Sequence, residues 1–381
     1  MRQVTLIQPE KLVFGEDCIM QFVNDFNALK HKSVIVVIAK PIRILLSNVL
    51  DRIKESGIKI TVCEDIQKEP TISAVENILS DISNLKIDSV VGIGGGSVLD
   101  VAKILAVKIN NPQTISEMVG IGRLNGRSTY LACIPTTSGT GSEVSPNAIL
   151  LDENDNMKKG IISPFLVPDA VYIDPALTLG LPPNLTAETG LDALCHCIEA
   201  YTNKFSHPII DLYALEGIRL ISNSLLNAVK NGSNLEDRTN LSLGSYYGGL
   251  CLGPVNTAAV HALSYPLGGE FHVSHGLANA ILLPAVFEFN SKANLHKHAQ
   301  IAAVFGVDSS LTEPEMVECG ILKLKELINS CGIPDKLSEI GIEISMIDKL
   351  AKMAMGVERL LKNNPRELTF NDAKDIYKKL F

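Results

Sequence analysis

The chain has 381 residues, which is enough for two domains with separate hydrophobic cores. Hydrophobic residues make up 46% and charged residues 20% of the sequence, a balance typical of a well-buried globular enzyme and not of a disordered chain. The formal net charge of −8, with no lysine- and arginine-rich cluster, argues against a nucleic-acid partner.

Targeting and redox features of the sequence indicate a cytoplasmic protein. No apolar run reaches membrane-spanning length, and the N-terminal segment soon meets Pro9 and Glu10, so it lacks the core of a signal peptide. Several of the eight cysteines lie inside apolar runs, which predicts reduced thiols and no disulfide framework. We therefore expect cytoplasmic localisation and no membrane partner.

The first half of the chain alternates short β-branched runs with segments of helical spacing. Strands are expected over 33–39, 58–63, 88–93 and 130–134, and helices over 41–56, 71–84 and 97–110. Continuous β-branched runs are typical of parallel strands that are buried on both faces. The alternation predicts a doubly wound α/β domain.

A glycine-rich turn joins the third expected strand to the helix that follows it. The backbone of Gly95, Gly96 and Ser97 could approach a pyrophosphate, and the helix N-terminus would add partial positive charge. Ser97 and Asp100 have the spacing of a capping box. The turn lacks the Gly-x-Gly-x-x-Gly pattern and follows the third strand instead of the first, so an ordinary Rossmann dehydrogenase fits poorly. A plain tight turn is the alternative.

A second polar loop follows the expected strand at 130–134. Thr136, Thr137 and Thr140 stand among glycines there and supply hydroxyl donors suited to phosphate or ribose. On composition alone, a polar surface turn is an equally good interpretation.

From Pro182 onward, helical spacing replaces the alternation. Helices are expected over 187–201, 208–230, 235–252 and 276–290, with further helices to the end and no convincing strand. The pair Pro182-Pro183 marks the expected boundary. We therefore expect an α/β domain over 1–183 and an all-α domain over 184–381.

Asp192 and His196 stand four residues apart in a helical run, so both side chains leave one helix face. His261 and His275 bracket a glycine-containing segment that lets the chain fold back toward the same point. One carboxylate and three imidazoles form a ligand set that suits Fe(II) or Zn(II) and is too rich in nitrogen for Ca or Mg. Taken singly, these residues are more often a surface pair and core histidines. Cys197 should lie on another face of the helix, where we interpret it as packing.

Three stretches resemble the iron-containing (group III) alcohol dehydrogenases: 190–200, 261–263 and 275–280. The resemblance covers nearly the whole chain and implies a dehydroquinate-synthase-like fold, with an α/β nucleotide-binding domain and a helical metal-binding domain. It implies Fe2+, or Zn2+, as the metal. The positions that match the family's metal ligands are Asp192, His196, His261 and His275.

The same resemblance implies residues that bind NAD(H) or NADP(H). These are Gly95, Gly96, Ser97, Asp100, Thr136, Thr137, Thr140 and Lys158, the last of which is placed near the nicotinamide ribose although Lys159 beside it leaves the register open. Members that prefer NAD carry an Asp where this chain has Ala39, followed by Lys40. The missing carboxylate removes repulsion against a 2′-phosphate, which predicts that NADP(H) is tolerated or preferred. The alternative is that specificity is set elsewhere.

Two residues near the expected metal are candidates for proton transfer. The family commonly has a histidine where this chain has Tyr265, whose phenol can donate a proton but is a much weaker acid, with an ordinary pKa of about 10. Packing of the pocket wall is the other interpretation. His272 is a second possible relay, or an ordinary surface histidine.

The resemblance implies hydride transfer between NAD(P)H and a small aldehyde/alcohol pair, in a homodimer or higher homo-oligomer with a small-molecule substrate as its other partner. A hydroxyacid–oxoacid transhydrogenase or a maleylacetate reductase would keep the fold and the hydride chemistry. A lyase of the dehydroquinate synthase type and a non-catalytic metal- or nucleotide-binding protein are further alternatives. Sparse Lys and Arg in the substrate half favour a neutral or weakly charged substrate.

Overall fold

The computed structural model describes residues 2–381, which form two compact units. The α/β unit contains residues 7–137 and 141–179. The helical unit contains residues 180–381, together with residues 138–140 and the N-terminal residues through Leu6. The fold class predicted from the sequence, an α/β part followed by an all-α part, is confirmed.

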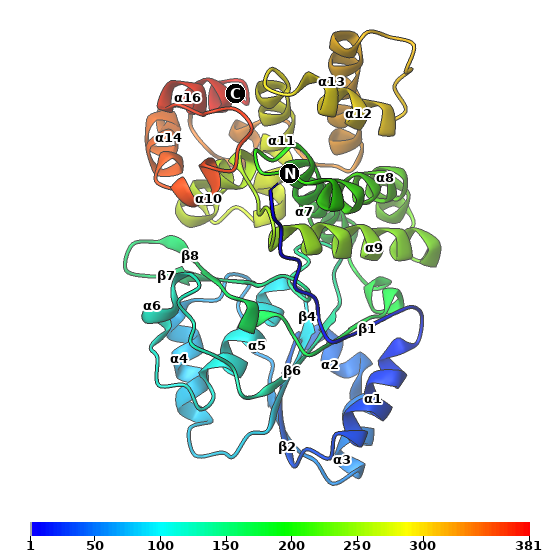
Figure 1. Cartoon of the computed structure of the whole chain (residues 1–381), viewed down its shortest axis with the longest axis vertical. Coiled ribbons are helices and arrows are strands. Elements are labelled where there is room, and N and C mark those ends of the chain that lie inside the picture. The colour runs from blue at the N-terminus through cyan, green and yellow to red at the C-terminus, as the bar shows by residue number, and fades with distance from the viewer. Residues whose placement is uncertain (1) are drawn as a thin grey trace. The chain divides into compact units, whose positions relative to one another are not determined.

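A parallel sheet forms the centre of the α/β unit (Figure 1). Its strands, in spatial order, are β1 (Lys11–Phe14), β9 (Ala170–Ile173), β6 (Tyr130–Pro135), β4 (Ser89–Gly94), β2 (Ser33–Ile38) and β3 (Lys59–Cys63). Every residue of β2 and β4 is buried, as continuous apolar strands in a parallel sheet require. The four predicted strands are present; β1 and β9 were not predicted, because each has only four residues.

Helices follow the strands of this unit. They are α1 (Cys18–Ala28), α2 (Lys40–Leu45), α3 (Ser47–Glu55), α4 (Ile72–Asp81), α5 (Gly96–Lys108) and α6 (Ile115–Met118). The single helix predicted over 41–56 is wrong, since the chain breaks at Leu46, whose φ of −103° and ψ of 21° are not helical. Leu46 is buried, whereas α2 buries none of its residues. The break between the two helices thus directs the Leu46 side chain into the core.

A second, smaller sheet contains β5 (Gly120–Ile121), β8 (Met157–Ile162) and β7 (Asn147–Asp152). Strands β7 and β8 are antiparallel, and the turn between them places Asn156 in the left-handed region at φ 53°. This hairpin was not predicted, although the run 152–156 is rich in turn residues.

The helical unit is built around the buried helix α7 (Pro183–Thr202), against which α8 (Pro208–Lys230) and α9 (Leu235–Leu252) pack. A Cβ added at Gly217 of α8 would lie 2.5 Å from the Cys197 sulfur, so glycine allows this close approach. Cys197 is fully buried there, which confirms its interpretation as packing. The remaining helices are α10 (Ala259–Phe271), α11 (His275–Ser291), α12 (Leu295–Val304), α13 (Glu313–Ser330), α14 (Ile347–Met355), α15 (Glu358–Leu361) and α16 (Phe370–Lys378).

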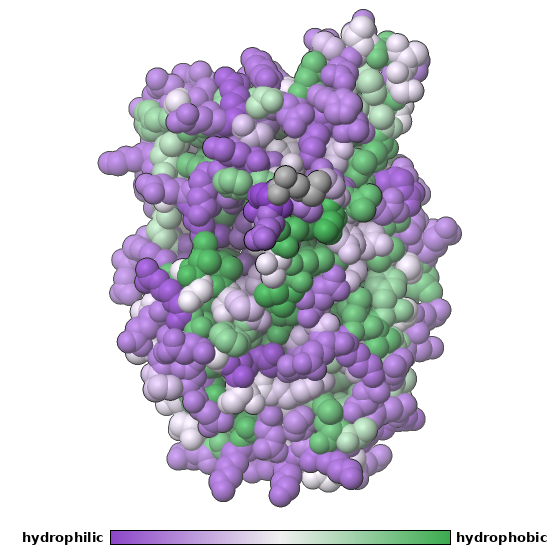
Figure 2. Space-filling view, in the orientation of Figure 1, coloured by the Kyte–Doolittle hydropathy of each residue, from purple (hydrophilic) through white to green (hydrophobic). Residues whose placement is uncertain are grey.

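The prediction of helices and no strand after Pro182 holds throughout the described residues, and α8 and α9 begin and end where the spacing predicted. None of the helices within residues 2–381 combines the length and the apolar character needed to cross a membrane. Hydrophilic residues cover most of the face shown in Figure 2, and hydrophobic residues gather in smaller patches among them.

Candidate metal centre and nucleotide-binding edge

The candidate nucleotide-binding residues follow three neighbouring strands of the parallel sheet. In the register, Ile38 of β2 lies beside Ile93 of β4, and Gly94 lies beside Pro135 of β6. The segments after β2, β4 and β6, which begin at Ala39, Gly95 and Thr136, therefore leave the same edge. The N–H of Ala39 donates to the Ile93 carbonyl and that of Thr136 to the Gly94 carbonyl, each over 3.0 Å.

The turn after β4 requires glycine because its backbone is crowded. A Cβ at Gly94 would lie 2.7 Å from Cβ of Val98, and one at Gly95 would lie 3.2 Å from the Thr137 hydroxyl. The turn and the threonine-rich loop thus lie so close together that a side chain at Gly95 would crowd Thr137. A turn without side chains lets a phosphate approach the backbone N–H groups at the start of α5, which is the arrangement that binds phosphate in other proteins.

The predicted capping box of Ser97 and Asp100 is wrong. Helix α5 has Gly95 as its N-cap and no side-chain cap. The Ser97 hydroxyl donates instead to the Lys68 carbonyl, while Asp100 accepts from the Ser142 hydroxyl at 2.5 Å and from the N–H of Ile149 at 2.9 Å. Asp100 therefore holds the segment after the threonine-rich loop, which offers its carboxylate better partners than the helix start.

A buried lysine that the sequence analysis missed supports the same segment. The Lys103 ammonium is fully buried and donates to the carbonyls of Ser145 and Asn147, each over 2.8 Å. Burial lowers the pKa of Lys103, and the nearby Asp100 opposes this shift. Burial also raises the pKa of Glu143 to about 7. The only signal in the sequence was a lone lysine within the apolar run of α5.

Lys158 lies on β8, where its ammonium pairs with the Glu69 carboxylate over 2.6 Å. Glu69 was not predicted as a partner of Lys158. Because the carbonyl of the preceding Lys68 accepts from Ser97, this ion pair lies next to the glycine-rich turn.

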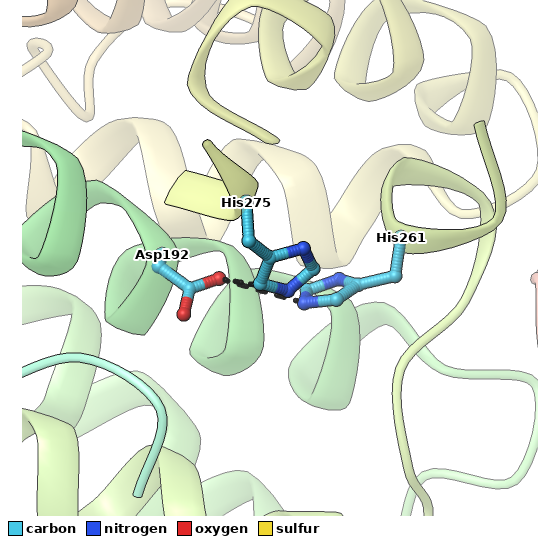
Figure 3. A group of neighbouring side chains, drawn as sticks. All are labelled: Asp192, His261 and His275. Atoms are coloured by element: carbon cyan, nitrogen blue, oxygen red, sulfur yellow. Dashed lines mark ion pairs between the residues drawn. The ribbon is translucent and has the colours of Figure 1, made fainter. Parts of the chain in front are cut away.

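Three of the four candidate metal ligands, Asp192, His261 and His275, come together with their ligand atoms within 4.8 Å of one another, and His196 lies beside this group in the helical unit. Asp192 and His196 lie one turn apart on α7, His261 lies on α10 and His275 begins α11. The Asp192 Oδ1 is 3.9 Å from Nε2 of His196 and 3.6 Å from Nε2 of both His261 and His275. Figure 3 shows Asp192, His261 and His275 pointing toward one another.

This cluster is buried except at His275, whose side chain is 29% exposed. The rings of His196 and His261 stack with centroids 4.8 Å apart. Burial would raise the pKa of Asp192, but the facing histidines outweigh it and hold that pKa well below its ordinary value. Burial lowers the pKa of His261, yet Glu199 and Asp192 reverse this and raise it to about 9. Burial lowers the pKa of His196, and the Asp192 carboxylate opposes this shift without reversing it.

Asn279, one turn after His275 on α11, completes the cluster and was missed as a neighbour. Its fully buried amide nitrogen lies 2.7 Å from the Asp192 Oδ1 and 3.2 Å from Nε2 of both His261 and His275. One NH2 group has two hydrogens for these three acceptors. Three acceptor atoms therefore converge on a point that has too few hydrogen-bond donors. A carboxylate oxygen and imidazole nitrogens are ligand atoms that fit a borderline divalent cation such as Fe(II) or Zn(II).

Close contacts with α7 fix the position of the first turn of α11, which contains His275. A Cβ at Gly276 would lie 2.3 Å from the Glu188 carbonyl oxygen of α7, so the first turn of α11 can reach α7 only with glycine there. The Ser274 hydroxyl also donates to the Glu188 carboxylate at 2.6 Å. These contacts place His275 next to the Asp192 face of α7.

The two candidates for proton transfer lie in different surroundings. Tyr265 is buried on α10, and its ring centroid lies 6.1 Å from that of His275. His272 is exposed and ends α10 in the left-handed conformation at φ 55°. The structure thus places the buried Tyr265 ring beside His275 and leaves His272 exposed at the end of α10.

A helical unit with a buried carboxylate–imidazole cluster, joined in one chain to a parallel-sheet unit with a glycine-rich turn, is typical of oxidoreductases that combine a metal with a dinucleotide. Residues 9–175 match the family described as iron-containing alcohol dehydrogenase, and residues 186–381 match the C-terminal part of the Fe-containing alcohol dehydrogenase family. The chain belongs to the iron-containing alcohol dehydrogenase family.

Individual relatives agree with this assignment. Long-chain-alcohol dehydrogenase 1 of Geobacillus thermodenitrificans is 35% identical, with 100% of this chain and 98% of the relative covered. A crystal structure of 1,3-propanediol oxidoreductase is 30% identical, with a TM-score of 0.96 and full coverage of both chains. NADH-dependent butanol dehydrogenase A from Thermotoga maritima is 25% identical, with a TM-score of 0.88, and the match covers 100% of this chain and 99% of that one.

These findings confirm the family predicted from the sequence and, with it, an oxidoreductase of alcohols and aldehydes. The names of the relatives do not favour the transhydrogenase, maleylacetate reductase, lyase or non-catalytic alternatives.

Proposed function

We propose that the chain interconverts small aldehydes and alcohols by hydride transfer with a nicotinamide dinucleotide. In this proposal the α/β unit, expected over 1–183, binds the dinucleotide, and the helical unit, expected over 184–381, holds substrate and one divalent cation, Fe2+ or Zn2+. The ligands would be Asp192, His196, His261 and His275. The single observation that carries the proposal is the convergence of a buried carboxylate and imidazole nitrogens on one amide group.

The bound cation would supply Lewis-acid polarisation of the carbonyl oxygen. The protein would contribute a buried carboxylate that balances the positive charge, and apolar helices that exclude bulk water. The exposed edge of His275 leaves one side of the cluster open to solvent, where a small substrate can enter.

The residues at the edge of the sheet would bind the dinucleotide. Backbone N–H groups of Gly95, Gly96 and Ser97 would receive the pyrophosphate at the start of α5. Hydroxyls of the threonine-rich loop, Thr136, Thr137 and Thr140, and the ammonium of Lys158 would position the ribose and nicotinamide. Asp100 would contribute indirectly, by holding the segment that contains Ser142.

We propose that the enzyme accepts NADP(H) as well as NAD(H). Ala39 follows β2 and has no carboxylate to repel a 2′-phosphate. The exposed Lys40 beside it pairs with Asp65 over 3.3 Å, and a weak surface pair of this kind can exchange its carboxylate for a phosphate.

Tyr265 is the better candidate for a proton role because it is buried beside His275, whereas His272 is exposed at a helix end. Replacing Tyr265 by Phe should lower turnover and shift its pH profile if the phenol moves a proton. Unchanged turnover with an unchanged profile would leave Tyr265 as a packing residue.

We further propose a cytoplasmic homodimer or higher homo-oligomer. Cytoplasmic localisation is supported by the cysteines, which are all free, as a reducing compartment would leave them.

The test is oxidation of NADH and of NADPH by short aldehydes. Protein stripped of metal would be assayed before and after anaerobic reloading with Fe(II) or Zn(II). We expect consumption of reduced nicotinamide only after reloading. Tight dinucleotide binding without metal-dependent turnover of any aldehyde would overturn the proposed function.

A further inference from the structure

Helix α7 carries a second buried carboxylate, Glu199, on the same face as the proposed ligands. Glu199 lies seven residues after Asp192 and three after His196, spacings that bring side chains to one side of a helix. It is 2% exposed, and the sequence analysis assigned it no role. A buried carboxylate requires partners, so its contacts show what it does.

Both oxygens of Glu199 engage the first turn of α10. Oε2 lies 2.6 Å from Nδ1 of His261, and Oε1 accepts the N–H of Val260 at 2.7 Å. Helix α10 has no side-chain cap of its own, because its N-cap residue is Ala258. Glu199 therefore satisfies a free N–H of the helix start and holds the ring of His261 at the same time.

This contact determines which nitrogen of His261 is free. A carboxylate only accepts hydrogen bonds, so Nδ1 of His261 must carry a proton whether the ring is charged or neutral. Nε2, which lies 3.6 Å from the Asp192 Oδ1, is therefore the nitrogen whose lone pair is available when the ring is neutral. The opposite tautomer would place a hydrogen at the point where the acceptors converge.

We propose that Glu199 is a positioning residue for the metal centre, fixing the orientation and the tautomer of His261 so that Nε2 is presented to the cation. The inference rests on the proposed function, because it assumes that His261 is a ligand. Partners of this kind commonly change metal affinity by about 10- to 100-fold when they are removed.

The variant Glu199→Gln separates positioning from simple capping. An amide has one acceptor oxygen, so it can receive the N–H of Val260 but cannot also hold the Nδ1 proton of His261 in the same way. If its NH2 faces Nδ1, the tautomer is reversed. The cap on α10 is thus retained while the hold on the imidazole is lost.

A matched control is Asp174→Asn. Asp174 is also buried, and it accepts the N–H groups of Ile19 and Ala176 at 3.3 and 3.1 Å, but it touches no histidine in the described residues. Its replacement should lower the melting temperature and leave metal binding unchanged. Glu199→Asp keeps the charge on a shorter side chain and should recover part of the affinity.

The experiment is a Co(II) titration of metal-free protein, with competition by a chelator for affinity and the visible absorption of Co(II) as a report on ligand geometry. We expect Glu199→Gln to bind Co(II) about 10- to 100-fold more weakly with an altered spectrum, Glu199→Asp to be intermediate, and Asp174→Asn to match the wild type. Should Glu199→Gln fail to fold, a Glu199→Asp protein with wild-type affinity and spectrum would overturn the inference. Wild-type affinity and spectrum in a folded Glu199→Gln protein would overturn the inference alone. A wild-type protein that takes up no Co(II) would overturn the proposed function together with it.

Discussion

The two units each bury a cluster of polar side chains, but the clusters differ in how their charges are balanced. In the α/β unit, Lys103 brings an ammonium to Asp100 and to the carbonyls of the following segment. In the helical unit, Asp192 and the imidazoles converge on the single amide of Asn279. The cluster in the α/β unit contains a cationic side chain, so it can stabilise the fold without a ligand. The cluster in the helical unit gathers hydrogen-bond acceptors around one amide, which indicates that it binds a cation from solution.

The largest expected effect concerns the cation of the α/β cluster. Replacing Lys103 by Met leaves two carbonyls without their buried donor and Asp100 without the nearby positive charge, and we expect the free energy of unfolding to fall by about 3–5 kcal/mol. Denaturant unfolding measures this change. Lys108→Met, on the same helix but only partly buried, should cost far less. Equal losses for the two variants would contradict the structural role of Lys103.

The same cluster should make stability depend on pH through Glu143, which interacts with Lys103 and Cys133. Its pKa is raised from an ordinary value of 4.5 to about 7. Between these two pH values the folded protein keeps a proton on Glu143 that the unfolded chain releases. The free energy of unfolding should therefore fall as pH rises through this window, by up to about 3 kcal/mol, and be unaffected by Glu143 outside it.

Glu143→Gln should remove this fall, so the variant gains stability relative to the wild type at pH 8 but not at pH 4. Denaturant melts at several pH values measure the slope. The exposed Glu153→Gln is the control and should keep the wild-type slope. A Glu143→Gln slope equal to that of the wild type would refute the assignment.

In the helical unit, the close approach at Gly276 offers a smaller test. Gly276→Ala places a Cβ against the Glu188 carbonyl, so α11 must shift and carry His275 with it. We expect a loss of about 1–3 kcal/mol of stability and weaker Zn(II) binding. Gly180→Ala, where the new Cβ meets no atom within 4 Å, should leave Zn(II) affinity unchanged. Unaltered affinity in Gly276→Ala would show that this contact does not place His275.

The smallest effect is expected at Ala39. Ala39→Asp adds a carboxylate where the 2′-phosphate is proposed to lie. The binding of NADPH should weaken by about 1 kcal/mol, or roughly fivefold, and the affinity for NADH should stay nearly unchanged. Titration of both dinucleotides at one salt concentration measures the ratio. An unchanged NADPH-to-NADH ratio would mean that specificity is set elsewhere.

Local patterns predicted the elements and suggested the candidate ligand residues, because both depend on short spacings. The interval between Asp192 and His196 requires only a helix, and the β-branched run at 33–39 requires only burial on both faces. His261 and His275 were candidates because they bracket a glycine-containing segment, and the family resemblance then matched all four positions to metal ligands.

The supporting residues could not be predicted, since their partners are distant in the sequence. Glu199 contacts His261 across 62 positions, and Lys103 contacts Asn147 across 44. The capping box at Ser97 failed for the same reason, because the distant Lys68 carbonyl and Ser142 hydroxyl compete successfully for Ser97 and Asp100. Sequence spacing gives the local candidate, and tertiary contacts decide between candidates.

The central claim is that the acceptor-rich cluster of the helical unit binds a divalent cation. The direct measurement is an anaerobic Fe(II) titration of metal-free wild-type protein and of Asp192→Asn, a variant that keeps the side-chain shape but removes the carboxylate charge. We predict one ion bound per chain in the wild type and an affinity at least ~100-fold lower in the variant. Equal affinity in the two proteins, or no uptake by the wild type, would contradict the claim.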